Sequence, residues 1–157
     1  MSDWYHNRLF VIGKPDEVTA IKHKAAGRAP FQEPSPLSFH NFVPLPEDII
    51  FLEECNSERH ECEYEYWGCK WGACYAELGA EYPGLLIYHF STPWGPPVAF
   101  FKQLARLYPN LSFHLETYSE EPTKESAFIF IGGLFHATDT SWIIRAQRRC
   151  TCAARSR

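Results

Sequence analysis

Alternating apolar and polar residues predict a β-strand over residues 4–12. Successive side chains of a strand point to opposite faces of a sheet. Tyr5, Leu9 and Val11 therefore share one face, which we expect to be buried. The opposite face carries the side chains of Trp4, His6, Arg8 and Phe10.

The same period of two, together with proline and glycine punctuation, predicts five further strands. They cover residues 37–43, 73–78, 85–92, 111–118 and 126–132. The last two are joined by a polar turn and are expected to form a β-hairpin. Residues 28–36 contain three prolines and are expected to form an irregular connector.

Two helices are predicted from apolar spacing. A short one begins at Pro15 or Asp16 and ends near Gly27. A clearer one follows Pro97, with apolar residues recurring every three or four positions at Val98, Phe101, Leu104, Ala105 and Tyr108. The acidic stretch 47–65 is predicted to form one or two helical turns in an excursion from the domain.

This order of elements predicts a ferredoxin-like α+β fold, in which two helices cover one face of an antiparallel sheet. The acidic excursion separates its two halves. The 157 residues suit one domain. We expect residues 1–135 to form that domain and residues 136–157 to be a C-terminal extension with an arginine-rich tail.

The sequence shows neither a membrane-spanning run nor a secretory signal, so a cytoplasmic location is expected. Six cysteines contain no C-x-x-C pair, although zinc ligands can be drawn from Cys55, His60, Cys62, Cys69 and Cys74. Closely spaced ligand pairs are missing. We therefore expect free thiols, with no metal and no cofactor.

Charge is distributed unevenly along the chain. Residues 1–144 carry a net charge of −9, while residues 145–157 hold five arginines and no acid. Eight acidic residues fall between positions 47 and 65, against the single base Arg59. A body of this charge repels phosphates, which weighs against broad nucleic-acid binding and favours a basic protein partner.

Several motifs together resemble the YubB-like family. They are the strand Trp4-x-x-Asn7-Arg8-Leu9-x-Val11-x-Gly13, the segment from Leu37 to Pro46, the motif Trp67-Gly68-x-Lys70-Trp71, and Phe90-x-Thr92-Pro93-Trp94-Gly95-Pro96-Pro97 followed by a helix and by Tyr108–Phe113. The resemblance covers roughly residues 3–133. It implies a ferredoxin-like domain encoded by conjugative plasmids, phages or pathogenicity islands, and it attaches no enzymatic activity.

An aromatic–lysine cluster is the sharpest candidate site. Two Trp-Gly pairs indicate a bend that brings Trp67, Lys70 and Trp71 close to Trp94. Such a cluster suits a pocket or a partner-binding hot spot. The competing interpretation, which we favour, is that the indoles pack the sheet and that Lys70 caps them by a cation–π contact.

The acidic run is the second candidate. Closely spaced carboxylates on a rigid domain can imitate a phosphate backbone and occupy a basic, nucleic-acid-binding surface of another protein. The candidate residues are Glu53, Glu54, Glu58, Glu61, Glu63 and Glu65. The alternative is that the run only keeps the protein soluble.

Catalytic and RNA-reading interpretations find less support. A nucleophilic pair of Cys69 or Cys74 with His89 or His114 is conceivable, but no positioning motif supports any such pair. Aromatic pairs on two predicted strands have the alternation of an RNA-binding sheet, namely Phe128 with Phe130 and Tyr88 with Phe90. The matching basic motif is absent, and we favour core packing for them.

Three functions follow from these observations. The first is a non-enzymatic mobile-element protein that binds and modulates a host or defence-system protein with a basic surface. The second is a single-stranded nucleic-acid binder that uses sheet aromatics and the arginine tail. The third is a small-ligand protein or enzyme with a pocket around Lys70.

Overall fold

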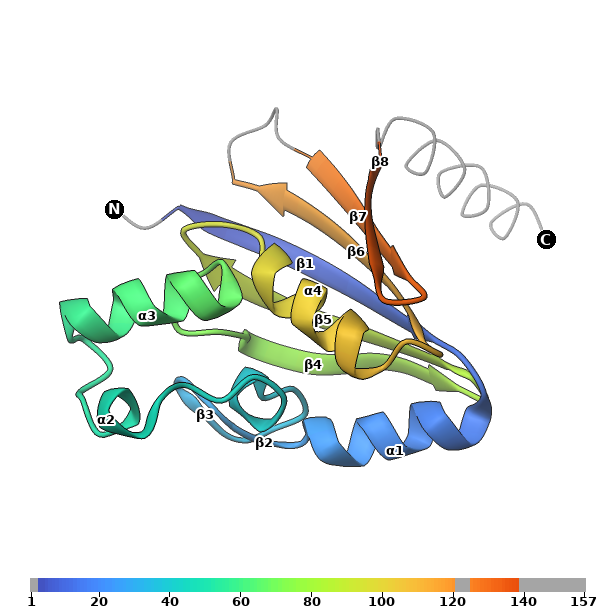
Figure 1. Cartoon of the computed structure of the whole chain (residues 1–157), viewed down its shortest axis with the longest axis horizontal. Helices are drawn as coiled ribbons and strands as arrows, with labels where there is room; N and C mark the ends of the chain where they lie inside the picture. Colours follow the sequence, from blue (N-terminus) through green and yellow to red (C-terminus); the bar gives the residue numbers. More distant parts are fainter. Residues whose placement is uncertain (1–2, 121–124, 139–157) are drawn as a thin grey trace.

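The computed structural model describes residues 3–120 and 125–138. Its central element is a six-stranded sheet in the order β4-β5-β1-β6-β7-β8, in which every neighbouring pair is antiparallel (Figure 1). The strands are β1 (Trp4–Ile12), β4 (Cys74–Tyr82), β5 (Leu85–Pro93), β6 (Ser112–Ser119), β7 (Glu125–Ile131) and β8 (Leu134–Thr138).

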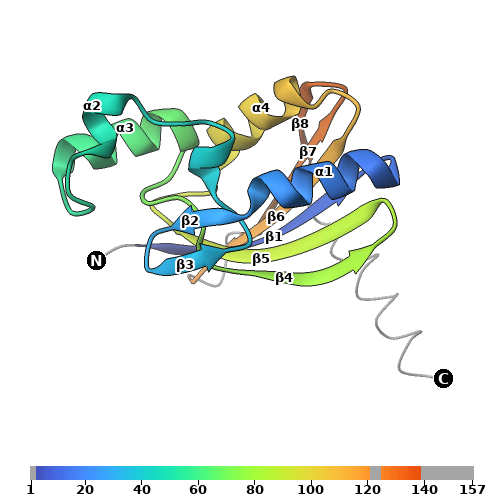
Figure 2. The same cartoon turned by 90° about the horizontal axis from the view of Figure 1, so that it is seen from below.

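Four α-helices occur within the described residues, which confirms the predicted α+β class. They are α1 (Pro15–Ala25), α2 (Glu47–Ile50), α3 (Ser57–Trp67) and α4 (Val98–Leu107). These helices lie on one side of the sheet, and no described helix covers the other side, which we call the open face (Figure 2). Both helices predicted from apolar spacing form at the expected positions, as α1 and α4.

The core lies between α1, α4 and the covered face of the sheet. Leu9 and Val11 of β1 are almost fully buried there, as the alternation predicted. Phe100 and Phe101 of α4 are also fully buried. Burial of such side chains contributes about 1.5–3 kcal/mol each, so this layer contributes substantially to the stability of the fold.

The prediction of a strand over residues 37–43 is wrong. This segment contains a short 3₁₀ helix, Phe39–Asn41, and packs beside the end of α1. The Asn41 side-chain amide donates to the carbonyl oxygens of Lys24 and Ala26, each at 3.0 Å. The ring of Phe39 stacks on Phe100 at 3.8 Å. The apolar residues of the segment thus cover the core rather than extend the sheet.

Two features were missed. The proline-rich connector contains a small hairpin of β2 (Gly27–Ala29) and β3 (Gln32–Ser35). Strand β8 pairs with β7 and crosses the predicted domain boundary at residue 135. The arginine-rich tail lies outside the described residues.

The acidic stretch is more regular than predicted. Asn56 caps α3, since its side-chain oxygen accepts from the Arg59 amide at 3.1 Å. The helix ends at Gly68, whose φ of 81° is the left-handed conformation that glycine adopts without strain. Helix α3 lies beside α4 (Figure 1). Of the described helices, none is long and apolar enough to cross a membrane.

Candidate functional site

The aromatic–lysine cluster exists as a set of contacts around Lys70. The Lys70 Nζ atom lies 4.2 Å from the ring centre of Trp71 and 5.2 Å from that of Trp94. The His60 ring lies edge-on to the same two indoles, at 6.1 and 5.7 Å. The structure therefore brings together three of the four predicted members and adds a histidine from α3.

Backbone strain is concentrated in these aromatics. Among the described residues, the non-glycine residues with positive φ are Phe31, Trp71, Tyr75 and Trp94, at 62°, 66°, 52° and 75°. Bulky residues rarely adopt this conformation, and each instance costs on the order of 1–3 kcal/mol. Phe31 lies edge-on to Trp71 at 5.0 Å, and Tyr75 contacts Trp4 at 5.9 Å. Strain of this kind is typical of functional sites.

Hydrogen bonds fix the two loops that carry the indoles. The Trp71 amide donates to Glu63 Oε2 at 2.8 Å, and its indole N–H donates to the Glu54 carbonyl at 3.0 Å. The Trp94 amide donates to the Asp3 carbonyl at 3.0 Å. The rings are consequently held in position before any partner arrives, which reduces the entropy lost on binding.

Trp67 does not belong to this surface. It is buried, and its indole N–H donates to the Val43 carbonyl at 2.9 Å. The prediction that Trp67 contacts a partner is therefore corrected, because its side chain has almost no solvent-exposed surface. For Trp67, the core-packing interpretation holds.

The acidic stretch forms an exposed surface with one exception. Seven of its eight acidic residues are exposed, whereas Glu63 is only 1% exposed. Arg59 donates from Nε to Glu63 Oε1 at 2.9 Å, and His60 Nδ1 lies 3.4 Å from Oε2. Glu63 is therefore an internal hub, and its assignment to the partner-binding surface is corrected. We call the other seven the acidic surface: Glu47, Asp48, Glu53, Glu54, Glu58, Glu61 and Glu65.

Exposed aromatic rings adjoin the acidic surface. Phe51, between α2 and α3, is 84% exposed. Tyr64 of α3 is 54% exposed, and its ring lies 6.3 Å from that of Trp94. The acidic surface and the aromatic–lysine cluster are thus joined along α3. Exposed aromatics next to charge are typical of protein interfaces.

A hollow of about 590 Å³ lies beside Trp71, beneath the β2–β3 hairpin. Trp67, Trp71 and Arg59 line it, whereas Lys70 does not. His40 also lines it, and burial, with the charge of Arg59 as the second cause, lowers the pKa of His40. The hollow therefore differs from the predicted pocket around Lys70.

The cysteines of the described residues are free thiols. No group of three or more metal-ligating side chains occurs within the part of the chain that the structure describes. Burial raises the pKa of Cys69 well above its usual range, and that of Cys74 to about 12. Both thiols are thus protonated near neutral pH, which makes them poor nucleophiles.

The sheet aromatics proposed for nucleic-acid binding face the core. Tyr88, Phe90 and Phe130 are almost fully buried. Phe128 packs against Phe135 at 6.0 Å. The preference for core packing is confirmed for Tyr88, Phe90 and Phe130, whereas Phe128 is half-buried and packs against the core.

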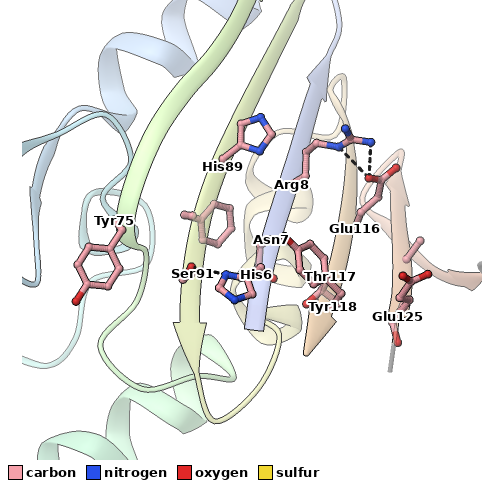
Figure 3. Close-up of a pocket in the computed structure, with 13 residues that line it drawn as sticks. His6, Asn7, Arg8, Tyr75, His89, Ser91, Glu116, Thr117, Tyr118 and Glu125 are labelled. Carbon is pink, nitrogen blue, oxygen red and sulfur yellow. Dashed lines mark hydrogen bonds and ion pairs between the residues drawn. The ribbon is translucent and has the colours of Figure 1, made fainter. Parts of the chain in front are cut away.

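A pocket of about 390 Å³, which was not predicted from the sequence, lies on the open face of the sheet. Figure 3 shows His6 and Arg8 of β1 between His89 and Ser91 of β5 and Glu116 of β6. Arg8 donates from Nε to Glu116 Oε2 at 2.9 Å. The alternation in residues 4–12 did place His6 and Arg8 on the outward face. Their neighbours depend on strand order, which the sequence does not reveal.

No protein-family model matches this sequence, and no curated protein matches it either. Among solved structures, the fold is similar to the crystal structure of protein api92 from Yersinia pseudotuberculosis, described under the family model DUF1281. The TM-score is 0.61 with 9% sequence identity, over 88% of this chain and 98% of that chain. At this identity the likeness is one of fold: this chain shares the architecture of a DUF1281 protein.

Proposed function

We propose that this protein binds a protein partner with a basic surface through the acidic surface and the adjoining rings of Trp71, Trp94 and Tyr64. The observation that carries the proposal is the strained, pre-positioned aromatic cluster at the edge of seven exposed carboxylates. Carboxylates steer a basic partner and set its orientation, while buried aromatic anchors supply most of the affinity.

The partner that fits this surface is a nucleic-acid-binding protein. Its phosphate-binding groups are cationic, and clustered carboxylates can take the place of phosphates. The resemblance to the YubB-like family supports a mobile-element protein that acts on a host or defence-system protein in the cytoplasm. Occupying the basic surface would prevent that protein from binding nucleic acid.

A ferredoxin-like arrangement is part of the same proposal. Strands β4, β5, β1 and β6 are adjacent in this order. Helix α1 follows β1, and α4 follows β5, so each half contains a strand–helix–strand unit. On this interpretation, β7 and β8 extend the unit at one edge, and α2 with α3 is an insertion that carries the binding surface.

The test compares two variants of equal charge. In the first, Glu58, Glu61 and Glu65 become Gln. In the control, three exposed acids elsewhere are neutralised, by Asp16→Asn, Glu77→Gln and Glu81→Gln. Basic proteins of a bacterial lysate are passed over each immobilised protein, and bound species are identified by mass spectrometry. We expect a defined DNA- or RNA-binding protein to be retained by the wild type and the control and lost by the first variant.

Two further measurements sharpen the test. Added oligonucleotide is expected to release the partner, because both compete for one surface. Trp94→Ala is expected to weaken binding by about 10-fold or more, as hot-spot tryptophans do. Equal retention by both charge variants, or binding indifferent to oligonucleotide, would contradict the proposal.

A further inference from the structure

The hollow beneath the β2–β3 hairpin is built on the core of the domain. Phe39, Trp67 and Ala73 line it, and all three are buried. The hairpin lies beside β4 (Figure 1). Gln32 fixes it there, since its side-chain amide donates to the Ala76 carbonyl and accepts from the Ala76 amide, each at 2.9 Å. A hollow of about 590 Å³ with such supports is in the size range of small-molecule sites.

Two strained aromatic residues also line the hollow. They are Phe31 and Trp71, with φ values of 62° and 66°, and their rings meet edge-on at 5.0 Å. Phe31 is 61% exposed, so core packing does not account for its ring. A glycine would adopt the same turn conformation without strain. Aromatic rings kept in a strained conformation beside a hollow indicate a site for a flat ligand.

Hydrogen-bond donors in the lining have no partner. Ser38 is 1% exposed, yet its hydroxyl makes no hydrogen bond within the described residues. Arg59 donates from Nε to Glu63 and from Nη1 to the Leu52 carbonyl, and its Nη2 has no partner in the same part of the chain. A buried polar group that lacks a partner is costly. A ligand with hydrogen-bond acceptors would satisfy both donors.

His40 adds a third donor to the lining. Its Nδ1 accepts from the Leu45 amide at 3.4 Å, so the proton of the neutral imidazole lies on Nε2. Burial lowers the pKa of His40, and the nearby charge of Arg59 lowers it further, which favours this neutral form near pH 7. The lining therefore offers a hydroxyl, an imidazole N–H and a guanidinium N–H to a ligand.

The charges around the hollow favour an uncharged ligand. Arg59 is paired with the buried Glu63 at 2.9 Å, and Arg28 with Glu33 at 3.3 Å. Glu54 also lines the hollow and belongs to the acidic surface. These carboxylates repel a phosphate. A cation would meet the three donors. An uncharged ring with oxygen and nitrogen acceptors suits both the donors and the charge.

We propose that this hollow binds a small, uncharged heteroaromatic compound with a carbonyl oxygen, namely a 6-oxopurine nucleoside. The flat ring contacts Phe31 and Trp71. Its carbonyl oxygen and ring nitrogen accept from Arg59, Ser38 or His40, and arginine recognises this edge of guanine in DNA. Adenine has an amine donor in place of the carbonyl and fits these donors less well. The site does not depend on the proposed partner.

The experiment compares inosine, which has the carbonyl, with adenosine, which has the amine. Inosine 5′-monophosphate is the third probe and tests the preference for an uncharged ligand. Ligand-observed NMR measures the Kd of each probe for the full chain and for Ser38→Ala, Phe31→Ala and Phe51→Ala. Phe51 is the matched control, an exposed aromatic outside the hollow. Urea unfolding checks each variant, and Ser38→Ala should be as stable as the wild type because its hydroxyl has no partner to lose.

We expect the wild type and Phe51→Ala to bind inosine about 10-fold more tightly than adenosine. Inosine 5′-monophosphate should bind more weakly than inosine. Phe31→Ala should weaken inosine binding by about 10-fold, and Ser38→Ala by about 3- to 10-fold. If one of these variants does not fold, the other decides. The proposal is overturned if inosine does not bind at millimolar concentration, if adenosine or the monophosphate binds as tightly, or if Phe31→Ala and Ser38→Ala both bind inosine like the wild type.

Discussion

The ammonium group of Lys70 lies over the face of the Trp71 indole, with Nζ 4.2 Å from the ring centre. Within the described residues, Lys70 has no carboxylate at ion-pair distance. A partly exposed cation–π contact contributes about 0.5–1 kcal/mol. We expect Lys70→Met to lower the free energy of unfolding by about that amount, measured by urea unfolding with tryptophan emission. Lys14→Met, at an exposed position, is the control and should have no comparable effect.

Glu63 supports the same loop from inside. It accepts from the Arg59 guanidinium and from the Trp71 amide, and it is 1% exposed. Removing one partner of a buried ion pair leaves the other charge uncompensated and costs about 3–5 kcal/mol. We expect Glu63→Ala to lose at least about 3 kcal/mol in urea unfolding, whereas Glu61→Ala on the exposed side of α3 should change little. Similar losses in both variants would show that Glu63 is not an internal hub.

How far the fold could be predicted depended on where each segment packs. Residues 85–92 and 98–108 each bury one face against the core. The strand therefore shows apolar residues at every second position and the helix at every third or fourth, and both could be predicted from the sequence. The segment around Phe39 is as apolar as a strand, yet the Asn41 side chain binds it to the end of α1. Such a long-range contact leaves no local pattern. Strand β8 was not predicted either, because it depends on pairing with β7 at the edge of the sheet.

The candidate site was predictable where its residues are close in sequence. The Trp-Gly motifs predicted the meeting of Lys70 and Trp71, and Trp94 followed from its rigid proline loop. Trp67 and Glu63 are buried and therefore do not belong to this surface. The residue types alone do not show which side of a helix is buried. The open-face pocket is lined by strands from distant parts of the chain. Only the register of β5, β1 and β6 brings His89, Arg8 and Glu116 together.

The buried thiol of Cys74 predicts a loss of stability at alkaline pH. Burial is the main cause that raises its pKa from 9.0 to about 12, and the charges of Glu63 and Glu54 add to it. A raised thiol pKa favours the folded state below pH 9, and this contribution falls as the pH rises from 9 towards 12. We expect the free energy of unfolding to decrease over this range, and less steeply in Cys74→Ala. An identical slope in the variant would contradict the argument.

Thiol reactivity provides an independent check of the same burial. Only thiolate reacts readily, so Cys69 and Cys74 should resist alkylation at pH 8 until the protein unfolds. Cys55 is exposed and should react in the folded state. The measurement uses a Cys150→Ser/Cys152→Ser variant with iodoacetamide and peptide mass spectrometry. Early labelling of Cys74 in native buffer would show that the thiol is accessible.

His40 predicts the opposite dependence on the acid side. Burial lowers its pKa from 6.5, and the nearby Arg59 charge lowers it further. Its Nδ1 lies 3.4 Å from the Leu45 amide, which donates to it only while that nitrogen is unprotonated. A lowered imidazole pKa stabilises the fold above pH 6.5, and this contribution is lost as the pH falls below that value. The free energy of unfolding should therefore be smaller at pH 5 than at pH 7.

The variant His40→Asn isolates this effect. Its side-chain oxygen can still accept from the Leu45 amide but carries no titratable proton, so the decrease between pH 7 and pH 5 should be smaller than in the wild type. His23→Asn changes an exposed histidine of α1 and should leave the decrease unchanged. Urea unfolding at both pH values measures the difference. If His40→Asn and His23→Asn behaved alike, the acid sensitivity would have to arise elsewhere, and His114, whose pKa burial also lowers, would be the next residue to replace.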